Sequence, residues 1–263
     1  MSQIEFKQTL KLAKNILVIT GAGISADSGI PTFRGSRALR WRNYESCNLA
    51  TLPAFLENPS LVWEFYHFRR EICLKANPNA AHAALSKFEM KCKKENKQFT
   101  LITQNVDGLH RRAGSENIIS IHGEIFETKC MKCKNVKENF ISPICEGLRD
   151  KGDPNSTENS SIPEESLPTC EFCRGLLRPN VVWFGENLHP DTLEKSYDAI
   201  KNCDLCVVIG TSGIVQPVAS FPYQVINRGV PVAEFNVEST DISGQVQYFI
   251  RGPASSTLPP LLE

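Results

Sequence analysis

Short runs of aliphatic and β-branched residues, each ending at a turn residue, constrain the fold more than any other feature of this sequence. Five such runs are NILVIT (15–20), FTLIT (99–103), IISI (118–121), LCVVIGTS (205–212) and VPVAEFNV (230–237). Continuous apolar runs suit strands of a parallel sheet that is buried on both faces. Between them lie segments whose apolar residues recur every three or four positions, as helices require. The alternation predicts an α/β fold with a doubly wound parallel sheet.

Two segments interrupt the alternation of strands and helices. Residues 36–76 are mostly helical in pattern, and residues 126–177 contain two cysteine pairs around a polar stretch that cannot bury a core. We expect these two insertions, one helical and one zinc-binding, to form a smaller domain. The three parts of the larger domain would then be residues 1–35, 77–125 and 178–263.

The charge balance excludes some classes of partner. The sequence has 29 Lys and Arg residues against 29 Asp and Glu residues, so no global field attracts nucleic acid or an anionic membrane. No apolar run approaches the roughly 20 residues that a membrane-spanning helix needs, and the first residues lack the pattern of a signal peptide or transit peptide. We therefore expect no direct nucleic-acid partner and no membrane partner.

Cysteine spacing predicts one metal site. Cys130 and Cys133, and Cys170 and Cys173, form a CxxC…CxxC set that can place four thiolates around one Zn²⁺. A shell closed by four thiolates leaves no position for water or substrate, so this zinc would be structural. The remaining cysteines lack such a pattern in the right context, and we assign all of them to packing: Cys47, Cys73, Cys92, Cys145, Cys203 and Cys206.

The first predicted strand runs into a G-x-G-x-x-A turn formed by Gly21, Gly23 and Ala26. Such a turn can present backbone N–H groups at a helix N-terminus to the pyrophosphate of a dinucleotide. The pattern alone is also compatible with a tight turn that binds nothing. The acidic residue that usually binds the ribose about 20 residues later is not evident, which disfavours an ordinary dehydrogenase.

Polar residues follow two other predicted strands. Gln104, Asn105 and Asp107 come directly after one strand, and His122 comes at the end of the next. Ligands of α/β proteins bind at the carboxyl edge of the sheet, so these side chains are candidates for a binding or catalytic site. His122 is a candidate general base because an imidazole is neutral near pH 7. The other four histidines are assigned structural roles.

These motifs together resemble the sirtuin family of NAD-dependent protein lysine deacylases. The segments that carry the resemblance are GAGISADSGIPTFRG (21–35), TQNVDGLH (103–110), IHG (121–123), the four-cysteine set, GTS (210–212) and the strand that ends at Asn236. They occur in the family's order over nearly the whole chain. The resemblance implies a Rossmann-like large domain, a small helical and zinc-binding domain, and a cleft between them in which NAD and an acylated lysine meet.

Residue roles follow from this resemblance position by position. His122 would act as general base, with Asn105 as a second catalytic residue. The implied NAD-binding residues are Gly21, Ala22, Gly23, Ala26, Phe33, Arg34, Gln104, Asn105, Val106, Asp107, Gly210, Thr211, Ser212, Asn236, Val237, Glu238 and Ala254. For the Asn and Ser residues at strand ends, capping is the alternative role. The segment Val182, Trp183, Phe184, Gly185 and Glu186 would bind acylated protein lysines by backbone pairing.

One helical segment of the small domain indicates specificity for the acyl group. Its apolar stripe is Leu61, Phe65, Phe68 and Ile72, and Tyr66 and Arg69 share a face offset from that stripe. An arbitrary Y-x-x-R pair is more often a solvated Arg beside an aromatic ring. This pair, however, matches the YxxR of the class III branch of the family, whose members are desuccinylases, demalonylases and deglutarylases. Ser46 would line the same acyl pocket.

The resemblance thus implies removal of succinyl, malonyl and glutaryl groups from lysine, with weak deacetylase activity. Products would be nicotinamide, O-acyl-ADP-ribose and free lysine. A protein ADP-ribosyltransferase and a non-catalytic scaffold that binds NAD and acyl-lysine are the alternatives. The resemblance also implies a mitochondrial matrix location, with cytosol and nucleus as further compartments.

Overall fold

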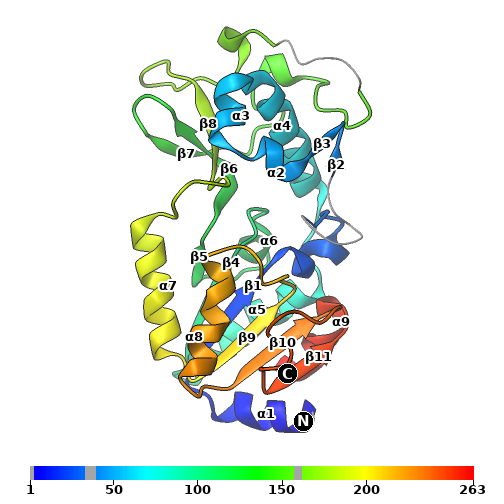
Figure 1. The fold of residues 1–263 in the computed structure, drawn as a ribbon, viewed down its shortest axis with the longest axis vertical. Coiled ribbons are helices and arrows are strands. Elements are labelled where there is room, and N and C mark those ends of the chain that lie inside the picture. The colour runs from blue at the N-terminus through cyan, green and yellow to red at the C-terminus, as the bar shows by residue number, and fades with distance from the viewer. Residues whose placement is uncertain (1–2, 33–39, 157–161) are drawn as a thin grey trace.

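The computed structural model describes residues 3–32, 40–156 and 162–263. Its largest element is a six-stranded parallel sheet in the order β5-β4-β1-β9-β10-β11 (Figure 1). The strands are β1 (Asn15–Thr20), β4 (Gln98–Thr103), β5 (Ile118–Ser120), β9 (Leu205–Ile209), β10 (Val232–Asn236) and β11 (Tyr248–Arg251). Within this sheet the chain order is that of dinucleotide-binding Rossmann folds. The predicted Rossmann-like parallel sheet is confirmed.

Helices cover both faces of the large sheet and make three layers. On β1, Ile16 and Val18 point into one hydrophobic core while Leu17 and Ile19 point into the other, because side chains alternate along a strand. The first core is shared with α1 (Gln3–Leu12), α5 (Ala80–Lys94), α9 (Ala254–Thr257) and α10 (Pro259–Leu262). The second is shared with α7 (Pro190–Asn202) and α8 (Phe221–Asn227).

A smaller domain stands on the carboxyl edge of the large sheet (Figure 1). It contains α2 (Ser46–Leu49), α3 (Leu52–Glu57), α4 (Pro59–Lys75) and the two-stranded β2 (Arg40–Trp41) and β3 (Tyr44–Glu45). A three-stranded antiparallel sheet, β7-β6-β8, completes it, with β6 (Gly123–Cys130), β7 (Val136–Glu138) and β8 (Leu177–Val181). Side chains from both insertions, such as Phe65 and Leu148, pack in one core. The short α6 (Leu109–Arg112) lies between β4 and β5 in the sequence.

Helix α4 carries the predicted acyl-binding pair and is buried on most of its surface. Asn58 caps it by accepting a hydrogen bond from the Leu61 amide, and Pro59 occupies the first turn. Of the predicted apolar stripe only Phe65 is fully buried, while the other three members are half-buried. The buried side chains instead surround the helix, because the small sheet and the loops after it pack on several sides: Val62, Trp63, Glu64, Phe65, Tyr66, His67, Arg69, Arg70 and Cys73.

The cysteines outside the four-cysteine set divide by environment. Cys203 and Cys206 are buried in the same core, as predicted, although Cys203 lies before β9 and not on it. Cys73 and Cys92 are also buried. The packing role predicted for Cys47 is wrong, because its side chain lies on the exposed side of the short α2. Within the described residues, no helix is long and apolar enough to cross a bilayer.

Candidate active site

A cavity of about 1230 Å³ lies between the carboxyl edge of the large sheet and the small domain. Every described residue of the expected NAD-binding set contributes to its wall: Gly21, Ala22, Gly23, Ala26, Gln104, Asn105, Val106, Asp107, Gly210, Thr211, Ser212, Asn236, Val237, Glu238 and Ala254. They come from the ends of β1, β4, β9 and β10 and from the start of α9. Phe33 and Arg34 lie outside the described residues.

The glycine turn after β1 packs closely against the end of β9 and is hydrogen-bonded to it. It leads into a 3₁₀ helix, Ala22–Ser28. A Cβ atom on Gly21 or Gly23 would come within 2.8 Å of Gly210, so both positions exclude a side chain. The amides of Gly21 and Gly23 donate to the carbonyls of Ile209 and Gly210 at 3.0 and 2.8 Å. These two N–H groups are therefore engaged within the chain and not available to a phosphate.

Residues at the ends of β4, β9 and β10 are linked by hydrogen bonds. Gln104 donates through Nε2 to Thr211 Oγ1 at 3.0 Å. Asn236 donates through Nδ2 to the Thr211 carbonyl at 2.8 Å, and its Oδ1 accepts from the Val237 amide at 2.9 Å. These hydrogen bonds agree with the capping role, and the residues also line the cavity, where the NAD-binding role expected from the resemblance stays a prediction.

Asn105 is held in one orientation by its neighbours. Its Nδ2 donates to the Gly21 carbonyl and to Ser25 Oγ, both at 3.1 Å. Because a carbonyl can only accept, the amide nitrogen must face Gly21, and the amide oxygen faces the other way. Ser25 in turn donates to Asp107 Oδ2 at 2.7 Å. Burial raises the pKa of Asp107, opposed by hydrogen bonds from the Leu109 amide and Ser25.

Two buried histidines support this polar group from behind. His82 Nε2 lies 3.4 Å from Ser25 Oγ, and His110 Nε2 lies 3.0 Å from Thr20 Oγ1. The two rings are 4.8 Å apart. Burial lowers the pKa of His82 to about 4 and lowers that of His110 as well, so both rings are neutral at pH 7. They are structural, as predicted from the sequence.

His122 lies where the chain passes from β5 of the large sheet to β6 of the small one, and it lines the cavity. Its Nδ1 is 3.1 Å from the carbonyl oxygen of Gln104. Because that oxygen can only accept, Nδ1 carries the proton of the neutral ring and Nε2 keeps its lone pair. Burial lowers the pKa of His122 from its ordinary value, and the bond to Gln104 opposes this only in part. The geometry provides a neutral imidazole that can accept a proton.

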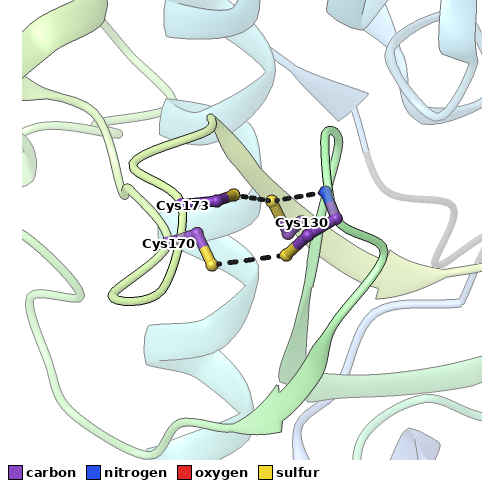
Figure 2. A group of neighbouring side chains, drawn as sticks. Cys130, Cys170 and Cys173 are labelled. Carbon is purple, nitrogen blue, oxygen red and sulfur yellow. Dashed lines mark hydrogen bonds between the residues drawn. The ribbon is translucent and has the colours of Figure 1, made fainter.

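The four cysteines of the CxxC…CxxC set come together beside the small sheet (Figure 2). Their Sγ atoms all lie within 4.8 Å of one another, with Cys130 3.4 Å from Cys173 and Cys133 3.7 Å from Cys170. Four thiolates at Zn–S bonds of about 2.3 Å in a tetrahedron are about 3.8 Å apart. The cluster therefore fits a structural zinc ion with no open coordination position.

The small-domain end of the cavity is aromatic and basic. Tyr66 and Arg69 from α4 line it, and the Arg69 guanidinium carbon lies 5.3 Å from the centre of the Tyr66 ring. The chain after β8 forms the adjoining wall, where Trp183 donates through Nε1 to the Tyr66 hydroxyl at 2.8 Å. Arg69 is 9% exposed and Tyr66 0%. Both residues line the cavity, with Arg69 slightly exposed and Tyr66 fully buried.

Comparison with known proteins identifies the family. The Sir2 family model matches residues 21–217. A Xenopus laevis protein named NAD-dependent protein deacylase sirtuin-5A, mitochondrial, is 51% identical over 261 residues, which cover 98% of this chain and 84% of the relative. A solved Sir2 homolog–NAD complex superposes with a TM-score of 0.83 at 38% identity, covering 100% of this chain and 93% of that one.

The chain belongs to the Sir2 family. A second solved sirtuin structure, of Sir2 with a p53 peptide and NAD+, has a TM-score of 0.78 at 30% identity over 97% of this chain and 95% of that one. The family resemblance noted in the sequence is thereby confirmed.

This sirtuin places some residues differently from the sequence-based expectation. Ser46 is not among the described residues that line the cavity. It begins α2 with its side chain buried in the small domain, and Ala50, one turn later, faces the cavity instead. Sequence reasoning also missed Ser25 and Cys73 as lining residues. Ser25 lies inside the first motif and could have been found there, whereas Cys73 gave no signal beyond helical spacing from Arg69.

Proposed function

We propose that this sirtuin is an NAD-dependent protein lysine deacylase that removes succinyl, malonyl and glutaryl groups. The observation that carries the proposal is the placement of Arg69 and Tyr66 in the wall of the same cavity that His122 and the strand-end residues line. A cation and a hydroxyl at the far end of an acyl-binding channel suit a substrate with a distal carboxylate. Relatives named NAD-dependent protein deacylase support the same reaction class.

The strand-end residues would hold NAD across the carboxyl edge of the large sheet. Asn236, Thr211 and Gln104 present polar groups there, and Asn105 presents its amide oxygen. When bound, NAD supplies the ribose that takes the acyl group once nicotinamide has left. His122 accepts a proton from a ribose hydroxyl through Nε2, which makes that oxygen a better nucleophile. The cluster of Asn105, Ser25 and Asp107 orients the amide that would face the nicotinamide ribose.

Residues 182–186 would bind the protein substrate by backbone pairing beside β8, which is an edge strand of the small sheet. Several amides of this segment already donate within the chain. Val182 donates to the His122 carbonyl and Phe184 to the Ala50 carbonyl, both at 2.9 Å, and Trp183 donates to Glu186 Oε2. Pairing with a peptide would therefore use mainly the carbonyl groups of the segment. Main-chain contacts depend little on the side chains of the peptide, so the acyl group would determine most of the substrate specificity.

Acetyl-lysine would be a poor substrate because it lacks the group that Arg69 and Tyr66 would bind. Sites built on polar pairing discriminate against analogues without the polar group far more strongly than sites that accommodate one methylene. The structural zinc lies beside the small sheet and takes no part in this discrimination. Because the Xenopus relative is named as mitochondrial, we also propose a mitochondrial location, with cytosol and nucleus as further compartments.

The test is product analysis by mass spectrometry after incubation with NAD and matched acetyl-, malonyl-, succinyl- and glutaryl-lysine peptides. The proposal predicts free lysine, nicotinamide and O-acyl-ADP-ribose, with faster turnover of the three acidic groups than of acetyl. Transfer of ADP-ribose to the peptide without loss of the acyl group would instead indicate an ADP-ribosyltransferase. Binding without any turnover would indicate a scaffold.

A further inference from the structure

The hydrogen bond between Trp183 and Tyr66 determines which way the tyrosine proton points. An indole N–H can only donate, so the Tyr66 oxygen accepts this bond, which is 2.8 Å long and buried. Arg69, the other group within hydrogen-bonding range of the hydroxyl, also has only donors. Neither neighbour can take the hydroxyl proton. Because Tyr66 lines the cavity, a carboxylate bound there could accept this proton.

Trp183 is itself held firmly by a pair of charged residues that are not needed for the chemistry. The Arg178 guanidinium lies over the indole ring, 3.4 Å from its centre. Its two terminal nitrogens donate to the two carboxylate oxygens of Glu186 at 2.5 and 2.9 Å. Glu186 also accepts the Trp183 backbone amide at 2.9 Å. The ring is therefore fixed from its face by Arg178 and through its main chain by Glu186.

The clamp formed by Arg178 and Glu186 is suited to remain charged. Arg178 is 7% exposed and donates also to the carbonyls of Pro179 and Val181, which ties it to the end of β8. Burial alone would raise the pKa of Glu186, but hydrogen bonds from Arg178 and the Trp183 amide more than offset this and hold it low. A bidentate pair of this kind restricts motion more than a single contact does.

We propose that Trp183, held by the Arg178–Glu186 clamp, is a positioning residue for acyl specificity: by occupying the Tyr66 oxygen as an acceptor, it directs the tyrosine hydroxyl proton toward the distal carboxylate of the acyl group. The inference rests on the proposed function, since it requires that a carboxylate occupy this end of the cavity. It assigns Trp183 a role through its N–H group, in addition to the space that its ring fills.

The test is a double-mutant cycle on kcat/KM with succinyl- and acetyl-lysine peptides of the same sequence. The variants are Trp183→Phe, Tyr66→Phe and the double variant. Trp183→Phe removes one neutral hydrogen bond, so we expect a loss on the succinyl peptide of about 2- to 10-fold, carried mainly by KM, and little change on the acetyl peptide. In the Tyr66→Phe background the same substitution should cost nothing further on the succinyl peptide.

Trp41→Phe is the matched control, because Trp41 is equally buried in the small domain and donates through Nε1 to a carbonyl, that of Gly152, at 3.0 Å. It should leave the succinyl-to-acetyl ratio unchanged. If Trp183→Phe does not fold, Glu186→Gln enters the same cycle, because loss of one charge loosens the clamp without removing the ring. It should show the same lack of additivity with Tyr66→Phe.

Equal losses on both peptides, or a full additional loss in the Tyr66→Phe background, would overturn the inference and leave Trp183 as a packing residue. Such a result would leave the proposed function standing, provided that Arg69→Met still impairs the succinyl peptide selectively. Failure of the proposed function has a different signature: Arg69→Met then affects both peptides equally, whatever Trp183 does.

Discussion

Replacing Arg69 with Met is the most informative single change in this protein. The guanidinium lies 5.5 and 5.3 Å from the ring centres of Phe65 and Tyr66, and the residue is 9% exposed at the cavity wall. Met has a similar length and packs well against aromatic rings, so the substitution preserves most of the contacts of the side-chain stem. The substitution removes only the guanidinium group that would bind the distal carboxylate.

The expected cost follows from the nature of that contact. Truncating one partner of a buried, hydrogen-bonded charge pair costs about 2–4 kcal/mol, which corresponds to a loss of about 30- to 900-fold in kcat/KM for the succinyl peptide. Acetyl-lysine makes no such pair, so its kcat/KM should change little or increase. The assay is steady-state kinetics on succinyl and acetyl peptides of the same sequence.

Arg70→Met provides the contrast for this prediction. Arg70 is 1% exposed and donates to the carbonyls of Ile125, Asn139 and Ile141, so it holds the small domain together. Its loss should lower the melting temperature and reduce activity on both peptides alike. If Arg69→Met behaved as Arg70→Met does, with equal losses on both peptides, the reasoning about carboxylate recognition would be refuted.

Three further predictions concern the base and the metal. His122→Ala should leave NAD affinity, measured by calorimetry, nearly unchanged and reduce turnover at least about 100-fold, as loss of a general base does; near-normal turnover would remove His122 from the mechanism. Because burial lowers the pKa of His122 below its usual 6.5 and only the neutral ring accepts a proton, kcat/KM should fall with decreasing pH only below pH 6.5, and an acid limb centred above that value would contradict this. Metal analysis should find one zinc per chain, and Cys130→Ser should lower the melting temperature or cause aggregation, since binding energy in such sites is folding energy; a well-folded chain without zinc would argue against the site.

The sheet was predictable from sequence because its strands are short, apolar and buried on both faces. Each of the five predicted runs coincides with one strand of the large sheet to within a few residues. The sixth strand, β11, was missed because its four residues form no comparable apolar run. The buried surface of α4 was also predicted poorly. Arg70 is buried because it binds carbonyls 55 or more residues further along the chain, and no local pattern shows such partners.

The candidate site was predictable to the extent that strand ends define it. Asn105 and His122 follow strands whose order in the sheet brings them to one edge, so their convergence follows from topology. The engagement of the Gly21 and Gly23 amides by the chain could not be predicted, because it depends on how closely β9 approaches the turn. The burial of Ser46 likewise depends on the direction of a one-turn helix, which four residues of sequence do not specify.

The position of His122 links the mechanics of the protein to its chemistry. The residue lies in the two-residue step between β5 and β6, which is one of the covalent connections between the large and small sheets. Its carbonyl also accepts the Val182 amide, at the point where the chain leaves β8 to return toward the large domain. A rotation of one domain against the other about this connection would therefore also change the orientation of the imidazole.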